Sequence, residues 1–462
     1  MKLESDLKRH ICEYYEARIL SGYYRCGDPL PSIHKVSAAF QVSVPTVRDA
    51  LTALEQQGYV TVDARKAARV TCRIPLSVCR QNAAEYFVPR ADGILDLVRG
   101  GHLLLLPCWN AGIEGWKKEE NPFPSDVIAP HVVLYITVLN RLQNRLLINL
   151  YWEILHYARF PFLMRQEDAA LSGSMADRQG PDALADLCQE LTDTFTQHVK
   201  SLFTFIEEAH IGYSLEQTAP VPFQWRIYRQ QPQLRYSFAS HLIRGIMYHR
   251  YPVGSKLPSL SCLAKQHGIS VNTVRRTLNL LEKLGVVESH QGKRSTVRME
   301  AAAFDVDEPE IREGLRLYLD ALHIVELTLH PVMLHVLENA SPKVHKELET
   351  GFAAMREQGK SNTCFEVIFA FIIKHSAFAI VRECYNTLLD LITWGFPLAL
   401  YRLFGHSLHE QYLDFNIRAE RYLQDQNWSG FSYDCMGLMS DERRQALAFI
   451  SQKSGRPTDW QH

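Results

Sequence analysis

Apolar residues recur at helical spacing in two stretches of this chain that lie 227 positions apart. They are Val47, Ala50, Leu51 and Leu54 in the first stretch, and the equivalent positions of the second hold Val274, Thr277, Leu278 and Leu281. A stripe at i, i+3, i+4 and i+7 predicts an amphipathic helix that buries one face. Each stripe follows a serine placed to cap a helix and stops at a glycine, so the sequence marks both ends of each helix.

A shorter helical run precedes each stripe, and an alternating stretch follows it. In the first copy the run covers residues 33–40, and the alternation covers 59–71 with a basic turn in its middle. The 34 positions that begin at Gly27 and at Gly254 share 14 identical residues without a gap. Helix, turn, helix and basic β-hairpin together predict a winged helix-turn-helix. In that motif the second helix enters the major groove of DNA by its N-terminal end, and the wing lies along phosphates.

The two segments that come after these motifs read as mainly helical. We therefore predict a mainly α fold with two winged helix-turn-helix domains, residues 1–75 and 226–298, whose wings are small β-hairpins. An all-helical bundle domain follows each of them, over residues 76–225 and 299–462. A shift of about 237 positions also aligns parts of the two helical segments, which indicates a tandem duplication of the whole unit.

Charge separates the two motifs. The chain of 462 residues carries a net charge of −1 at pH 7, but residues 226–298 hold 13 Lys and Arg against two acids. Residues 1–75 hold 11 against eight. A strongly basic module inside a neutral protein suits a polyanionic partner. We therefore expect the second motif to supply most of the affinity for phosphates.

The rest of the composition predicts a cytoplasmic protein that does not associate with a membrane. The chain begins with the charged MKLESDLKRH, and its longest apolar run, residues 103–109, is much shorter than a membrane span. The ten cysteines are scattered without a CxxC pair. This usage favours reduced thiols and the cytoplasm.

The pattern GxxLPS…VSxxTVRxAL…L…G, which the second copy follows except at Ile269 and Thr277, resembles the DNA-binding domain of GntR-type bacterial transcriptional regulators. The resemblance implies that Ser32 and Ser259 open the first helix of each motif, and that the start of the second helix contacts DNA. The residues expected at the DNA are Ser32, His34, Ser43, Thr46, Arg48, Lys66 and Arg69 in the first copy, and Ser259, Ser270, Asn272, Thr273, Arg275, Arg276, Lys293 and Arg294 in the second.

Both copies also depart from the family pattern. The family usually has arginine two residues after LPS, where this chain has His34 and Ser261, and directly after VS, where it has Val44 and Val271. Arginine-to-guanine contacts are the commonest specific base readout, so we expect an altered or weaker recognition code. An alternative is that one or both motifs have become protein-contact or structural modules.

A polar row occurs at equivalent places in the two helical segments. It consists of Arg145, Asn149 and Glu153 in the first segment, and of Arg382, Asn386 and Asp390 in the second. At i, i+4 and i+8 these side chains share one helix face. The face is either solvated or a buried polar strut, or it is a stripe in which arginine grips an anionic ligand and asparagine orients it.

The GntR resemblance implies an all-helical effector domain behind each DNA-binding domain, which adds weight to the ligand-facing interpretation. His375 and Asn386 match part of that domain's motif, but Phe371 stands where the motif has Asp. The tentative effector-binding residues are Arg145, Asn149, His375, Arg382 and Asn386. No metal and no other cofactor is carried over.

The sequence therefore predicts a sequence-specific DNA-binding transcriptional regulator. Its two motifs would read two half-sites of a double-stranded DNA operator, under the control of a small-molecule effector. One chain then acts as an internal pseudo-dimer, or two chains form a homodimer. The sequence has no GxGxxG after a strand, no Walker loop, no GxSxG and no HExxH, so we do not expect an enzyme. The alternative function is a non-sequence-specific DNA-binding or protein-interaction scaffold with degenerate winged helices.

Overall fold

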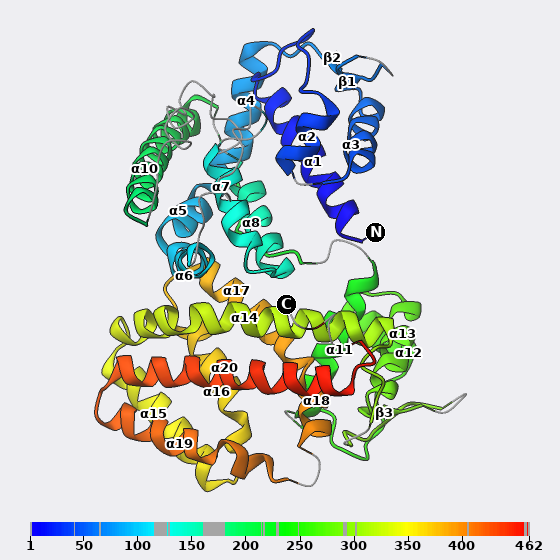
Figure 1. Cartoon of the computed structure of the whole chain (residues 1–462), viewed down its shortest axis with the longest axis vertical. Helices are drawn as coiled ribbons and strands as arrows, with labels where there is room; N and C mark the ends of the chain where they lie inside the picture. Colours follow the sequence, from blue (N-terminus) through cyan, green and yellow to red (C-terminus); the bar gives the residue numbers. More distant parts are fainter. Residues whose placement is uncertain are drawn as a thin grey trace. The chain divides into compact units, whose positions relative to one another are not determined.

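The structure of the protein is a computed structural model (Figure 1). It describes residues 2–40, 42–63, 66–114, 127, 130–159, 181–213, 215, 218–227, 231–247, 249–289, 293–300, 303–403, 406–456 and 460. The chain forms two compact units. The first comprises Met1–Arg99, Trp109–Leu142 and Ile148–Gln224, and the second Gly100–Cys108, Gln143–Leu147 and Trp225–His462. The predicted domain boundaries inside each unit stay predictions.

Unit 1 begins with a winged helix, here called head 1. Its elements are α1 (Lys2–Leu20), α2 (Ile33–Phe40), α3 (Val44–Gln56), β1 (Val60–Thr61) and β2 (Arg69–Val70). The two strands pair antiparallel with Val60 opposite Val70, and Pro29 forms a further bridge to Arg69. The predicted stripe of α3 is the buried face of this helix, where Val47 and Leu54 have no exposed surface.

Unit 2 contains the second winged helix, here called head 2, with the same elements in the same order. They are α11 (Gln231–Met247), α12 (Leu260–His267), α13 (Val271–Lys283), β3 (Val287–Glu288) and β4 (Thr296–Val297). Val287 pairs with Val297, which is the register of head 1 shifted by 227 positions, and Lys256 bridges to Thr296. The predicted fold class, mainly α with two small β-hairpin wings, is confirmed.

Both second helices end at a backbone turn that needs glycine. Gly58 has φ +81° and Gly285 has φ +72°, in the left-handed region that other residues adopt only with strain. The turn reverses the chain, so that the next residues enter the first strand of the wing. The glycine that ends each apolar stripe in the sequence therefore fixes where the wing begins.

The rest of unit 1 is helical. It contains α4 (Leu76–Phe87), the short 3-10 helix η1 (Val88–Arg90), α5 (Ala91–Gly100), α6 (His102–Ile113), α7 (Pro130–Asn140), α8 (Arg145–Ala158) and α10 (Pro181–Gly212), although parts of α5, α6 and α8 belong to unit 2. Phe87 of α4, Ile94 of α5 and Leu202 of α10 share one apolar cluster. This cluster ties α4, the helix that follows head 1, to α10.

The helical part of unit 2 is built on two long helices that lie side by side, α14 (Pro309–Glu338) and α20 (Trp428–Lys453) (Figure 1). The other elements are α15 (Pro342–Glu357), the 3-10 helix η5 (Ser361–Thr363), α16 (Cys364–His375), α17 (Ala379–Thr393), α18 (Phe396–Arg402) and α19 (Leu408–Gln424).

One buried carboxylate joins four of these helices. Glu442 of α20 forms an ion pair with Arg402 of α18 at 2.8 Å, and both side chains are 8% exposed. The hydroxyls of Tyr318 of α14 and Tyr412 of α19 donate to the same carboxylate at 2.9 and 3.1 Å. A buried charge is tolerated when it is paired and hydrogen-bonded in this way.

By length and composition alone, α14 could cross a membrane, and within the described residues it is the one helix that meets this test. Half of its most apolar window is buried inside the protein. The buried positions include Leu322, Val325, Leu329 and Val336, which recur at helical spacing. This is the pattern of a core helix in a helical bundle.

A second carboxyl, that of Glu366, is only partly satisfied in this way. Glu366 lies in the first turn of α16, and its Oε2 is buried without a hydrogen-bond partner among the described residues. Burial raises the pKa of Glu366 to about 7, against the opposing effects of a backbone hydrogen bond and of the Arg244 charge. The protonated form is therefore favoured in the folded protein below neutral pH.

We expect Glu366→Gln to stabilise unit 2 at high pH only. The folded-state pKa lies above the ordinary value, so the stability that the protonated side chain contributes at low pH is lost as pH rises from about 4.5 to about 7. In urea unfolding, the variant should equal the native protein near pH 4.5 and exceed it by on the order of 1–3 kcal/mol at pH 8. Glu357→Gln, at an exposed carboxylate, is the control. A difference that does not change with pH would contradict the assignment.

Candidate nucleic-acid interface

The second helix of each head starts with a side-chain cap. Ser43 Oγ accepts from Thr46 N at 3.4 Å, and Ser270 Oγ accepts from Thr273 N at 3.0 Å. In both heads the serine and threonine hydroxyls also lie 2.8 Å apart. These bonds satisfy amide groups that lack helical partners, and they hold the end of the helix that a winged helix presents to DNA.

The first helix of each motif is opened by the serine that the resemblance indicated. Ser259 Oγ accepts from Cys262 N at 3.3 Å, and Ser32 Oγ accepts from Lys35 N at 3.4 Å. His34 is exposed in the same turn of α2, and Ser261 takes the equivalent place in α12. These side chains therefore lie at helix starts, as expected for residues near a phosphate backbone.

Head 2 presents unpaired cations on its wing and on α13, its recognition helix, which is the second helix of the helix-turn-helix motif. Asn272, Arg275 and Arg276 are exposed on α13, and Lys293 and Arg294 are exposed on the wing. These four cations form no ion pair within the described part of the chain. Their charges are therefore available to a polyanion without the loss of an existing partner.

Head 1 presents fewer such charges. Arg48 is exposed on α3, but Asp49 stands where head 2 has a second arginine. On the wing, Lys66 pairs with Asp63 at 3.5 Å, and the Arg69 guanidinium donates to the Gly27 carbonyl at 2.8 Å. Phosphate binding by head 1 would have to compete with these contacts.

The two threonines predicted to contact DNA differ in exposure. Thr46 is 4% exposed in head 1, while Thr273 is half-buried in head 2. In both heads the hydroxyl faces the capping serine. Positioning the helix start is therefore the role that the described contacts support, and direct contact with DNA stays a prediction.

Two segments of the chain, residues 7–70 and 237–297, match the family of bacterial regulatory proteins named gntR. Each match covers most of one winged helix, so both heads are similar to this family. A Mycobacterium gastri protein described as the HTH-type transcriptional regulator RmpR is 31% identical over 93 residues, which is 20% of this chain. The chain spans only about a third of that relative, 32% of its length.

The solved structures that match this chain have low sequence identity to it. Streptococcus agalactiae GntR is 17% identical over 46% of this chain and 99% of its own, with a TM-score of 0.21. Lar, which controls the expression of the Listeria monocytogenes agr system, is 12% identical over 48% and 98%, with a TM-score of 0.24. E. coli McbR/YncC is 16% identical over 49% and 99%, with a TM-score of 0.26. The gntR assignment of the heads rests on the family match, not on these superpositions.

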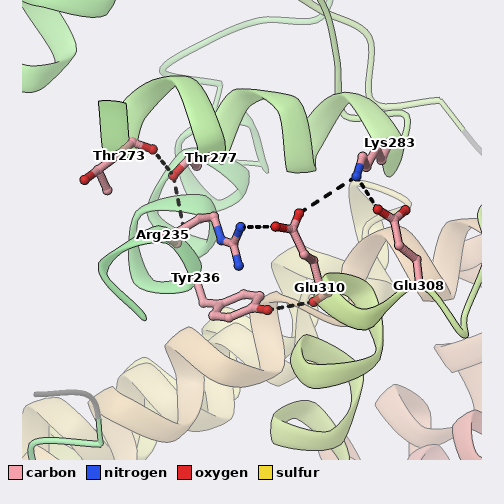
Figure 2. Close-up of polar contacts among 7 residues, drawn as sticks. All are labelled: Arg235, Tyr236, Thr273, Thr277, Lys283, Glu308 and Glu310. Carbon is pink, nitrogen blue, oxygen red and sulfur yellow. Dashed lines mark hydrogen bonds and ion pairs between the residues drawn. The ribbon is translucent and has the colours of Figure 1, made fainter. Parts of the chain in front are cut away.

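The recognition helix of the second gntR head is tied to α14 by a polar cluster that sequence reasoning missed. Figure 2 shows Lys283, the last residue of α13, between the carboxylates of Glu308 and Glu310. Glu310 also accepts from Arg235 of α11 at 2.5 Å, and its backbone oxygen accepts from the Tyr236 hydroxyl at 2.7 Å (Figure 2). The side chain of Glu310 therefore connects α14 to α11 and to the recognition helix α13.

Charge and burial in this cluster agree with its geometry. The hydrogen bond to Glu308 raises the pKa of Lys283, and burial raises the pKa of Tyr236 to about 12. Lys283 and Tyr236 therefore both stay protonated at neutral pH.

The face of α13 that carries Thr277 also contacts α11. Thr277 Oγ1 lies 3.0 Å from the Thr273 carbonyl and 3.3 Å from the Arg235 carbonyl (Figure 2).

A further pair of residues missed by the sequence reasoning anchors the wings. Glu55 Oε1 accepts from Val62 N at 2.7 Å, and Glu282 Oε1 accepts from Ser289 N at 2.9 Å. Each glutamate thus fixes the start of its wing to the recognition helix. The signal was present in the sequence, because glutamate occupies the same place in both copies.

The tentative effector-binding residues are spread over several elements, and some have structural partners. The Arg382 guanidinium donates to the Ser376 carbonyl at 2.6 Å, and Asp390, from the same polar row, pairs with Arg244 of α11 at 2.5 Å. These contacts favour the polar-strut interpretation of the row in α17. His375 lies against the ring of Phe371.

The other members of the set lie on α17 and α8. Asn386 is exposed on α17, Arg145 is exposed at the first position of α8, and Asn149 is half-buried one turn later. Ligand binding by these residues stays a prediction. Among the residues that the structure describes, no three His, Cys, Asp or Glu side chains come together as a site for a metal ion.

We expect Glu310→Ala to destabilise unit 2 by about 1–3 kcal/mol, because it leaves the buried guanidinium of Arg235 without its carboxylate. Glu308→Ala is the matched control, since its pair with Lys283 lies at the surface and should contribute less than about 1 kcal/mol. Urea unfolding of the full chain measures both values. Equal losses would mean that Glu310 does not hold the head to α14.

Proposed function

We propose that this protein is a sequence-specific DNA-binding transcriptional regulator whose two gntR heads read two half-sites of one operator. The observation that carries the proposal is the surface of head 2. A capped recognition helix presents Arg275 and Arg276, and the wing beside it presents Lys293 and Arg294, all exposed and without an ion pair in the described part. Arginines at a recognition helix and cations along a wing are what major-groove reading and phosphate binding require.

The two heads contribute unequally in this proposal. Head 2 supplies most of the affinity, because its cations are unpaired. Head 1 has one free guanidinium on α3, beside Asp49, and Lys66 and Arg69 of its wing are engaged. The operator preferred by one chain should therefore have two unequal halves.

Two heads in one chain support the idea of an internal pseudo-dimer. The shared order of elements, the shared strand register and the two family matches favour a tandem duplication as its origin. Bacterial operators are commonly read by two recognition helices about one helical turn apart. A homodimer of this chain would present four heads to a longer site.

We further propose that a small molecule bound in the helical parts controls DNA binding. It would do so by binding one of two arrangements of a head more tightly than the other. The match to a family of regulatory proteins favours such a regulator over an enzyme.

Selection of bound duplexes from a random DNA library, at near-physiological salt, tests this function. We expect an enriched motif with two unequal halves. A symmetric motif of double length would indicate the homodimer. Binding without enrichment that is lost as salt rises would leave a non-specific scaffold, and the regulator proposal would be wrong.

We expect Arg275→Ala to weaken binding to the selected duplex by about 1–3 kcal/mol, if the side chain reads a base. Arg48→Ala, the equivalent change in head 1, should cost less, because that head provides fewer free cations. Titration of a labelled duplex at constant salt gives both values. A larger loss for Arg48→Ala would reverse the ranking of the heads.

A further inference from the structure

A cavity of about 1110 Å³ opens in unit 1 where head 1 meets the helices that come after it. Its walls come from the end of α1 and residues 21–26, from residues 72–75 between β2 and α4, and from the facing sides of α4 and α10. Ligand sites for small molecules commonly have volumes of about 300–1,000 Å³. The cavity is therefore large enough for a metabolite and is formed by one unit alone.

The charge of the lining has one sign. Arg25, Arg73 and Arg80 line the cavity, and among the described residues no aspartate or glutamate does. The three guanidinium groups are exposed and form no ion pair with any residue that the structure describes. Cations that line one cavity repel one another, and an anion bound among them would relieve this repulsion.

The start of α4 adds to the positive potential. Pro75 occupies the N-cap position of this 12-residue helix, and it provides no side-chain cap. Among the described residues, no side chain caps the first amide groups of α4, and this helix end lines the cavity through Pro75 and Leu76. Such amides and the helix dipole favour an anionic group.

The inner wall is apolar and aromatic. Phe87 and Leu202, both buried members of the cluster between α4 and α10, line it together with Phe205. At the rim, Leu76 is 73% exposed. An apolar body would cover these side chains while its charged group faces the arginines.

We propose that this cavity binds an organic anion, a molecule with an aromatic or branched apolar body and a carboxylate, sulfonate or phosphate group. The anionic group lies among Arg25, Arg73 and Arg80 near the start of α4, and the body lies on Phe87 and Phe205. Arginine is suited to this task because its planar fork donates two parallel hydrogen bonds to such groups.

The place of the cavity gives the ligand a role. It lies between the base of the wing of head 1 and α4, so a bound anion contacts both the DNA-binding module and the helix behind it. This role rests on the proposed regulator function, since it assigns the controlling small molecule to this site. The binding itself does not depend on DNA and is measured without it.

The test uses the full chain and the dye anilinonaphthalene sulfonate, a flat aromatic anion that fluoresces when it is shielded from water. We expect one saturable site, and binding at least about tenfold weaker in Arg73→Glu/Arg80→Glu, which corresponds to the loss of one charge-assisted hydrogen bond. Lys343→Glu/Lys360→Glu, an equal charge reversal at exposed positions outside the cavity, should leave dye binding unchanged.

The reactivity of cysteine thiols reports the location of the dye. Cys26 and Cys72 line the cavity, whereas Cys262 is exposed on head 2. Bound dye should slow alkylation of Cys26 and leave Cys262 unaffected, as followed by mass spectrometry. Displacement by phenylphosphate and by benzoate then identifies the preferred anionic group.

Dye binding that neither protects Cys26 nor weakens in Arg73→Glu/Arg80→Glu would show that the cavity does not hold the anion. The same result with weakened binding of the double variant to DNA would assign these arginines to the nucleic acid, and would also overturn the proposal. Because the dye is titrated without DNA, this failure is distinct from a failure of the library selection.

Discussion

The amide groups at the start of a recognition helix have no partners within the helix, although this end must keep its shape to meet DNA. In both heads a serine hydroxyl accepts a hydrogen bond from one of these amides, and the hydroxyl of a threonine one turn later lies next to it. Three other features of each head then position the rest of the recognition helix and the wing. The buried stripe sets the rotation of the helix, the glycine ends it, and a glutamate in its last turn holds the wing.

The two heads are equal in this internal construction and differ in how they connect to the helical part of their own unit. In unit 2 the helix after the wing brings Glu308 and Glu310 to the recognition helix, where they neutralise Lys283 and Arg235. In unit 1 the equivalent connection brings Arg73 and Arg80, which form no ion pair with any described residue. The connection of head 2 is therefore neutralised by carboxylates of its own unit, while that of head 1 keeps its positive charge.

Local spacing explains what the sequence could predict. Helix caps, apolar stripes, terminal glycines and alternating strands each involve residues a few positions apart. Both winged helices, and the positions of Ser43, Ser270 and Arg275 in them, can therefore be predicted from the sequence. The contact of Arg235 with Glu310 joins residues 75 positions apart, and no local pattern contains it. The same is true of the cavity, where Arg25 and Arg80 line one space because α4 packs against α1. The polar row of α17 was recognised, but its main partner, Arg244, lies 146 positions earlier.

The difference between Asp49 of α3 and Arg276 of α13 has a consequence for how such a protein evolves. In a symmetric dimer every mutation occurs in both subunits, so each change in recognition is doubled and must suit two half-sites at once. Two heads encoded in tandem mutate one at a time. If the two heads read two half-sites as proposed, a substitution in one head leaves the contacts of the other head unchanged, so the two specificities can change independently.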